Sequence, residues 1–159
     1  MGIHYADGDL FKGIKHVQSP LVIPHICNDE GRWGAGFSGA LSRHFSEPEK
    51  VYRSRTPHLG DVQWITIGPS VRVVNMVAQH GTDDAHARGQ PPIRYWALTT
   101  CMEKVAAEIR ISEIHAPMFG SGLAGGDRNT IEACIQEVWC DEGILVTIYR
   151  WGQRVTNEA

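Results

Sequence analysis

The 159-residue sequence lacks the features that would place a protein in a membrane or in a secreted class. No apolar stretch approaches the ~20 residues that a bilayer-spanning helix needs. The opening residues, MGIHYADGDL, have no basic start followed by an apolar run, which a secretory signal would require. Ala6 stands where a myristoylation motif requires Ser or Thr, so lipidation is not expected either. We therefore expect a cytoplasmic protein with no membrane partner.

The cysteines and histidines form no metal-binding pattern. The four cysteines never occur as C-x-x-C, and no two of the eight histidines are spaced as H-x-x-x-H. A zinc site needs several such ligands at suitable spacing, so we predict neither a metal nor another cofactor. Cysteines in apolar settings are typical of reduced core thiols in a cytosolic protein. They are Cys27, Cys101, Cys134 and Cys140.

Neither acidic nor basic residues predominate in the sequence. The formal net charge is −3, so no basic field indicates a nucleic-acid partner, and none is expected. The motif G-x-x-x-x-G-K-[ST] does not occur, which excludes a P-loop NTPase. The composition, with 42% hydrophobic residues, is typical of a globular protein. The length fits one domain spanning residues 1–159.

Strand and helix patterns alternate along the chain. Short runs rich in β-branched residues predict strands, and apolar residues recurring every three or four positions predict helices. Pro24 lies inside one expected strand and indicates an edge position or a bulge. We predict one three-layer α/β/α sandwich with a mixed sheet. The expected strands are residues 3–7, 21–27, 61–68, 71–79, 113–119 and 144–149, the helices are 36–45, 92–110 and 128–140, and the longest loop is 80–92.

Two short stretches, GAGFSG at 34–39 and GSGLAG at 120–125, share the spacing G-x-G-x-x-G. Each follows an expected strand and precedes a helix, where free backbone N–H groups and the helix dipole favour an anion. Loops of this kind meet at the carboxyl ends of the strands, so two of them suit a ligand with a diphosphate. Tight turns alone are the alternative. A Rossmann site fits poorly, because the first stretch follows the second strand and no acidic strand end lies about 20 residues beyond it.

Four segments in a characteristic order extend the pattern: GDLF (8–11), HICNDEGRWGAGFSGAL (25–41), NMVAQHG (75–81) and APMFGSGLAGGD (116–127). Together they resemble the macro domain, and most closely the branch that contains the terminal ADP-ribose protein glycohydrolase and the yeast ADP-ribose-1″-phosphate phosphatase. The resemblance extends from Asp7 to Trp151. It implies the macro domain fold, with ADP-ribose or an ADP-ribosylated protein as the partner.

The resemblance implies that the two glycine loops hold the diphosphate and the distal ribose. Asn28 would reach that ribose, although an Asx turn is the alternative role for such a loop residue. Phe37 and Phe119 border the loops, either as packing residues or as walls of the ligand site. The ligand-binding residues expected here are His25, Asn28, Gly34, Ala35, Gly36, Phe37, Phe119, Gly120, Ser121, Gly122, Leu123, Ala124 and Gly125.

The resemblance implies a separate set of residues for adenine. Asp9 would accept a hydrogen bond from the adenine amino group, beside the backbone of Leu10. Tyr149 would pack against the adenine ring, a role that Trp151 could share. The alternatives are a helix-capping role for Asp9 and a core position for Tyr149.

The glycohydrolase subgroup uses a covalent lysine and an aspartate in the second glycine loop, and this chain departs from both. Ala78 or Gln79 stands at the lysine position, and Ala124 stands at the aspartate position. Since glutamine is neither a nucleophile nor a base, we expect hydrolysis by a positioned water. The catalytic candidates are Asp127, His80, Asn28 and Gln79, with His25 as a further one. Asp127 also fits a helix cap, and Asp83, Asp84 and His86 lie in a lid or in a solvated loop.

Three functions stay open at this point. The first is a hydrolase that removes ADP-ribose from ester-linked Glu or Asp side chains of proteins, or from O-acyl-ADP-ribose. The second is an ADP-ribose-1″-phosphate phosphatase, and the third is a reader that binds ADP-ribose without turnover. We expect the hydrolase, because a chain of this length offers no second domain for a reader to recruit.

Overall fold

The computed structural model describes residues 2–82, 89–122 and 124–150. Their strands form one six-stranded sheet in the order β1-β6-β5-β2-β4-β3. All neighbouring strands are parallel except β3 and β4, which form an antiparallel pair. The strands are β1 (His4–Ala6), β2 (Leu21–Asn28), β3 (Val62–Thr66), β4 (Val71–Gln79), β5 (Glu113–Pro117) and β6 (Val146–Tyr149).

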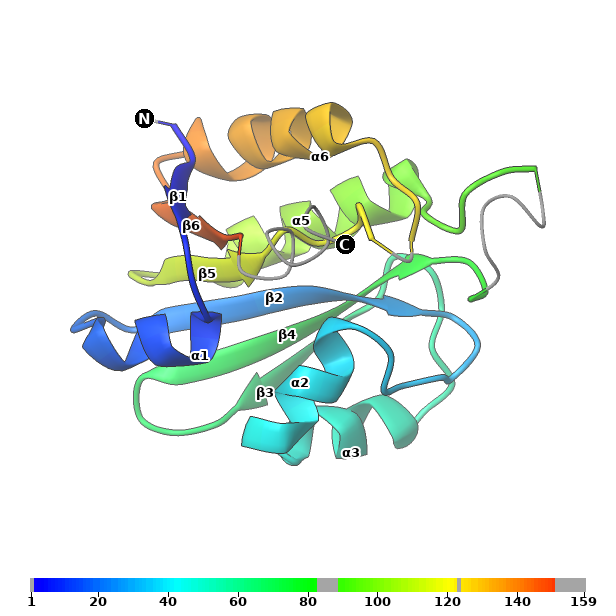
Figure 1. The fold of residues 1–159 in the computed structure, drawn as a ribbon, viewed down its shortest axis with the longest axis horizontal. Coiled ribbons are helices and arrows are strands. Elements are labelled where there is room, and N and C mark those ends of the chain that lie inside the picture. Colours follow the sequence, from blue (N-terminus) through cyan, green and yellow to red (C-terminus); the bar gives the residue numbers. More distant parts are fainter. Residues whose placement is uncertain (1, 83–88, 123, 151–159) are drawn as a thin grey trace.

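Helices cover both faces of the sheet. The helices α1 (Leu10–Gly13), α2 (Phe37–His44) and α3 (Glu47–Arg53) lie on one face, and α5 (Tyr95–Glu108) and α6 (Arg128–Ile135) lie on the other (Figure 1). A 3₁₀ turn at Ile14–His16 follows α1, and a π-helical turn at Gln136–Cys140 follows α6. Each helical layer has its own cluster of buried apolar side chains against the sheet. The expected three-layer α/β/α sandwich with a mixed sheet is therefore confirmed.

The longest helix begins three residues later than its apolar pattern suggests. The periodic residues of α5 are buried as expected, among them Ala97, Cys101 and Val105. The segment before Tyr95 instead pairs with the end of β4. Ile93 forms an isolated antiparallel bridge with Gln79, and the carbonyl of Pro92 accepts a hydrogen bond from the backbone N–H of His80. This pairing holds residues 92–94 outside the helix.

Pro24 lies in an interior strand, so the expected edge position is wrong. β2 is paired with β4 along its length, and Pro24 lies opposite Val74. On the other side, β2 pairs with β5 only at Leu21 and Val22. The two strands diverge beyond that point, so no paired β5 residue needs the N–H that proline lacks. A bulge does occur in β2, but it lies between Cys27 and Asn28.

The divergence of β2 and β5 positions the loops that follow them. The chain leaves β2 through α2 and α3 toward β3 and β4, and it leaves β5 through α6 toward β6 on the opposite side. Two adjacent parallel strands whose connections depart in opposite directions form a topological switch point, where open α/β sheets bind their ligands. The two glycine loops follow these two strands.

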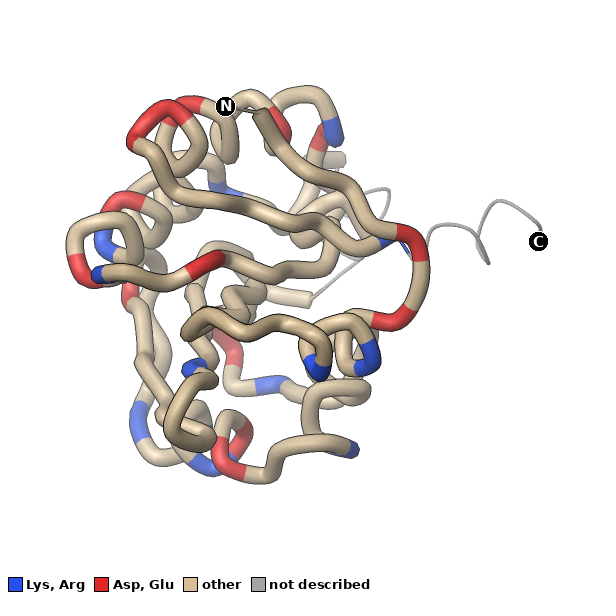
Figure 2. The backbone as a smooth tube through the Cα atoms, turned by 90° about the vertical axis from the view of Figure 1, so that its left-hand side faces the viewer, with Lys and Arg blue, Asp and Glu red and all other residues tan. Residues whose placement is uncertain are grey.

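Charged residues of both signs are distributed over the described part of the chain (Figure 2). Acidic and basic residues are interspersed along the backbone on the face that Figure 2 presents, in agreement with the small net charge. None of the helices formed by residues 2–82, 89–122 and 124–150 has the length and the apolar character to cross a membrane.

Candidate ligand-binding cleft

A cavity of about 480 Å³ lies at the carboxyl ends of β2 and β5. Both glycine loops line it, together with the last residues of the two strands and the end of β4. Its volume lies within the range of ordinary small-molecule sites. The lining residues are His25, Ile26, Cys27, Asn28, Arg32, Trp33, Gly34, Ala35, Gly36, Phe37, Ser38, Gln79, Thr82, Pro117, Met118, Phe119, Gly120, Gly122 and Ala124.

The first glycine loop ends at the N-terminus of α2. Gly34 and Gly36 have φ values of 122° and 61°, which L side chains rarely adopt. Gly36 is the N-cap residue, and no side chain caps this helix end. The first N–H groups of α2 therefore remain available to an anion.

Close packing holds this loop against its own helix. A Cβ atom on Gly39 would lie 2.5 Å from the carbonyl oxygen of Gly34, so only glycine fits there. The backbone N–H of Gly34 donates to Ser38 Oγ at 2.9 Å, and Ser38 Oγ donates to the carbonyl of Ala35 at 3.0 Å. The loop is thus held in its curved form by its own helix.

The second glycine loop is tied to the opposite helical layer. Gly120 has a φ of 84°, and a Cβ atom there would lie 2.9 Å from Ile131 Cδ1. The N–H of Gly126 donates to the Gly120 carbonyl at 2.7 Å, which closes the loop on itself. Gly122 differs, because a Cβ atom there would meet nothing within 4 Å. Its position faces open space at the cavity.

Among the described lining residues, the one formal charge belongs to Arg32, which is paired with Glu30. Arg32 lines the cavity with a side chain that is 73% exposed, and its Nε lies 3.4 Å from Glu30 Oε2. Among the described residues that line the cavity, none is Asp, Glu or Lys. Sequence reasoning missed Arg32, although the residue lies two positions before the first glycine of the loop. It also missed Trp33, Ser38 and Thr82.

Asn28 organises the loop between β2 and the first glycines. Its Oδ1 accepts hydrogen bonds from the backbone N–H groups of Glu30 and Arg32 and from the Tyr52 hydroxyl, and its Nδ2 donates to the Arg32 carbonyl. This is the Asx-turn role that the sequence left open. Asn28 also lines the cavity, so its contact with a distal ribose stays a prediction.

His25 lies in the cavity wall as a buried, uncharged ring. Its Nε2 donates to Asn75 Oδ1 at 2.6 Å, and its ring packs edge-on against Trp33 and at an angle against Phe37. Burial lowers the pKa of His25 from 6.5 to about 4, and the hydrogen bond to Asn75 only partly offsets this effect. A histidine that is neutral and 1% exposed suits a wall position better than proton transfer.

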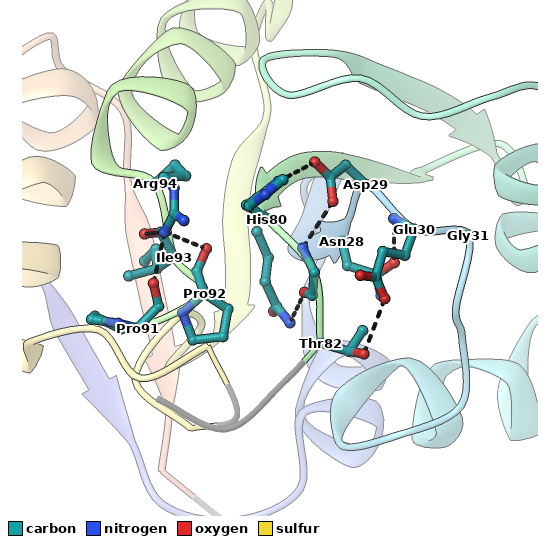
Figure 3. Close-up of polar contacts among 12 residues, drawn as sticks. Asn28, Asp29, Glu30, Gly31, His80, Thr82, Pro91, Pro92, Ile93 and Arg94 are labelled. Atoms are coloured by element: carbon teal, nitrogen blue, oxygen red, sulfur yellow. Dashed lines mark hydrogen bonds and ion pairs between the residues drawn. The ribbon is translucent and has the colours of Figure 1, made fainter. Parts of the chain in front are cut away.

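The two residues that the sequence offers for the lysine position, Ala78 and Gln79, have different surroundings at the end of β4. Ala78 is fully buried in the core under α5, whereas Gln79 lines the cavity. The Nε2 of Gln79 donates to the Gly81 carbonyl at 2.9 Å. The next residue, His80, does not line the cavity, and its Nδ1 lies 2.7 Å from Asp29 Oδ2 (Figure 3).

The comparisons with known proteins decide the family. No protein-family model matches the chain. A solved structure of a macrodomain protein from Streptomyces coelicolor matches it with a TM-score of 0.77 and 35% identity, over 92% of this chain and 97% of that one. The chain belongs to the macrodomain family. The resemblance stated from the sequence is therefore confirmed.

Other relatives of this macrodomain differ in how much they share with it. A Bacteroides thetaiotaomicron protein of unknown function has a TM-score of 0.86 and 39% identity, over 94% of this chain and 98% of that one. The Mus musculus chromodomain-helicase-DNA-binding protein 1-like is 29% identical over 164 residues, which cover 92% of this chain but 17% of that protein. The Lodderomyces elongisporus ADP-ribose 1″-phosphate phosphatase is 31% identical over 52 residues, covering 33% of this chain and 32% of the enzyme. The matches thus span a third or less of these two curated relatives.

Of the residues expected to hold adenine, Asp9, Leu10 and Tyr149 do not line the cavity. Asp9 is the N-cap of α1 and accepts a hydrogen bond from the N–H of Phe11 at 3.0 Å. Leu10 is buried behind it. Tyr149 is 9% exposed, and its hydroxyl lies 2.9 Å from His115 Nδ1. The structure thus shows the capping and core roles, and an adenine contact for these residues stays a prediction.

Other expected residues also lie outside the lining. Asp127 is the N-cap of α6, where its carboxylate accepts hydrogen bonds from the backbone N–H and the hydroxyl of Thr130. These bonds lower the pKa of Asp127. Ser121 and Gly125 belong to the second glycine loop but do not line the cavity. The expected roles of Leu123, Trp151, Asp83, Asp84 and His86 concern residues that lie outside the described part of the chain.

Proposed function

We propose that this macrodomain binds ADP-ribose in the cavity between β2 and β5. One observation carries the proposal: two glycine loops that are 86 positions apart line a single cavity, and one of them ends at an uncapped helix N-terminus. Backbone N–H groups at such a terminus suit a diphosphate. The positive charge of Arg32 and the lack of a carboxylate among the described lining residues favour an anion as well. A partial relative acts on ADP-ribose 1″-phosphate.

We further propose that the bound ADP-ribose is the product of hydrolysis. The substrate would be ADP-ribose joined through an ester to a Glu or Asp side chain of a protein, or O-acyl-ADP-ribose. No lysine is among the described lining residues, and Gln79 cannot form a covalent intermediate. Water is then the nucleophile, and the cavity contributes by holding the diphosphate and orienting the distal ribose.

Binding is tested first, at Gly122. Its φ lies outside the left-handed range and a Cβ atom there meets nothing within 4 Å, so we expect a substitution to leave the fold intact. Gly122→Glu places a negative charge beside the diphosphate and is expected to weaken ADP-ribose binding at least tenfold, or about 1.4 kcal/mol. Gly122→Gln is the matched neutral control and should retain more affinity. Calorimetric titration that gives equal affinities for the two variants would contradict a diphosphate at this loop.

Turnover is tested with three compounds. Release of ADP-ribose from a glutamate-linked ADP-ribosylated protein or from O-acyl-ADP-ribose is the expected result. Phosphate released from ADP-ribose-1″-phosphate, with both esters intact, would instead indicate a phosphatase. Binding of ADP-ribose without any product would indicate a reader.

A further inference from the structure

A histidine–aspartate pair is formed by two residues that are next in the chain to residues lining the cavity. Asp29 is the first residue after β2, and His80 is the first residue after β4. His80 Nδ1 and Asp29 Oδ2 lie 2.7 Å apart, and the two side chains point toward each other (Figure 3). Sequence reasoning singled out His80 but missed Asp29, which is 51 positions away. The pair exists only because two neighbouring parallel strands end side by side.

The backbone fixes both partners. Asp29 Oδ1 accepts the N–H of Gly81 at 2.8 Å, and the N–H of Asp29 donates to the Gln79 carbonyl at 2.9 Å. The N–H of His80 donates to the Pro92 carbonyl at 2.8 Å. The ends of two strands and the segment before α5 therefore hold the pair in place.

The carboxylate determines which nitrogen of His80 carries the proton. Burial by itself would raise the pKa of Asp29, but the hydrogen bonds from Gly81 and His80 together lower it. Asp29 is thus ionised near neutral pH and only accepts hydrogen bonds. Nδ1 must then be the donor, so the neutral ring has its lone pair on Nε2. Among the described residues, no hydrogen bond to this Nε2 is present.

The chain neighbours of the pair line the cleft, although His80 and Asp29 themselves do not. Gln79 and Thr82 flank His80 and Gly81 in the chain, and both line the cavity. Asn28, which precedes Asp29, also lines it. The His80 side chain is 50% exposed and is open to solvent, from which a water can be drawn.

The geometry points to His80 as the general base of the proposed hydrolysis, with Asp29 as the residue that positions it. This inference rests on the proposed function. Water attacks C1″ of the ester-linked ribose while the bond between C1″ and the ester oxygen breaks. The electron pair of that bond leaves with the carboxylate, and the water proton goes to Nε2. Asp29 stabilises the resulting imidazolium, which then releases its proton to solvent.

Within the described part of the chain, the charged groups near the pair are Glu30, Arg32 and Arg94. Glu30 accepts a hydrogen bond from Thr82 on the far side of Asn28, and Arg32 lies beside Glu30. The Arg94 guanidinium donates to the carbonyls of residues 91–93, including the Pro92 carbonyl that also accepts from His80. Figure 3 shows the contact between Glu30 and Thr82 and those of Arg94.

The test uses the full chain and the glutamate-linked ADP-ribosylated protein. His80→Ala is expected to lower kcat by about 10²–10⁴-fold, with the affinity for ADP-ribose unchanged. Imidazole added to the buffer should restore part of the rate, because the site is open to solvent. Asp29→Asn should lower kcat at least tenfold and change the pH dependence of kcat, with KM unchanged. His58→Gln is the matched control, since His58 lies 3.7 Å from Asp61 in a similar exposed pair that does not line the cavity.

The possible results distinguish the catalytic role of the His80–Asp29 pair from the proposed hydrolase activity. A His80→Ala variant that turns over at the wild-type rate overturns the base role and leaves the hydrolase intact. Loss of kcat without imidazole rescue, and with Asp29→Asn unchanged in its pH profile, assigns the pair to structure alone and also overturns the role. A wild-type protein that binds ADP-ribose but releases none from either ester overturns the hydrolase and, with it, this inference.

Discussion

The buried His25 makes the stability of this macrodomain sensitive to acid. The Asn75 amide is fixed because its Nδ2 donates to the Pro48 carbonyl at 3.1 Å and to Gln63 Oε1 at 3.0 Å. Its Oδ1 is left to accept a hydrogen bond from His25 Nε2. No carboxylate among the described residues contacts the His25 ring, whose other neighbours are the Cys27 thiol and aromatic rings. A proton on the ring would therefore be an uncompensated buried charge.

The sign and the size of the effect follow from the pKa of His25. In the unfolded chain this histidine titrates near 6.5, whereas burial lowers its pKa to about 4 in the folded protein. As the pH falls below 6.5, the unfolded state gains a proton that the folded state does not bind, so the free energy of unfolding falls. The slope is up to about 1.4 kcal/mol per pH unit, and the total loss reaches about 3 kcal/mol near pH 4.

The assay is urea denaturation of the wild type and of His25→Gln at several pH values between about 7 and 4.5. The glutamine amide retains an N–H donor for Asn75 but does not titrate. Subtracting the two curves removes every other group, including Asp29, that responds to acid in both proteins. We expect the stability advantage of the wild type to shrink steadily below about pH 6.5. A difference that is independent of pH would refute the buried, neutral state of His25.

Two further substitutions test the glycine loops and the cap of α6. Gly39→Ala should lower the free energy of unfolding by about 1–3 kcal/mol and weaken ADP-ribose binding, because the new Cβ atom would displace the Gly34 carbonyl. Denaturation measures the first effect and calorimetry the second. The control Gly122→Ala should change neither the stability nor the affinity. Asp127→Ala should lower the melting temperature by removing the cap that Thr130 shares, and should leave kcat at saturating substrate unchanged. A large loss of kcat would return Asp127 to a chemical role.

The sequence predicts this fold well where the determinants are local. The glycine spacing and its place between strand and helix are properties of short segments, so both loops can be located from the sequence alone. The helix over α5 follows from residues four positions apart. Its first residues cannot be placed in this way, because their pairing with Gln79 depends on a strand that is distant in the sequence. The edge position expected for Pro24 is wrong for a similar reason, since the divergence of two strands decides whether a proline is tolerated.

The site is less predictable because its side chains meet across the sheet. No pattern links Asp29 to His80, and none links Tyr149 to His115, yet both pairs form where neighbouring strands bring them together. The sequence pattern assigns no role to Arg32, because the direction of its side chain depends on how the loop turns. Asn28 and Asp127 illustrate the opposite case. Each has a local capping or turn role that its residue type favours, and the structure shows that role.

The Ser38 hydroxyl has a consequence for the selectivity of the cleft. It already accepts the Gly34 N–H, so an incoming phosphate oxygen replaces an existing partner there and gains little from that one amide. The shape of the cavity is instead formed before the ligand binds. We therefore expect phosphate compounds whose shape does not fit the cavity to bind weakly, even though the charge of Arg32 attracts them.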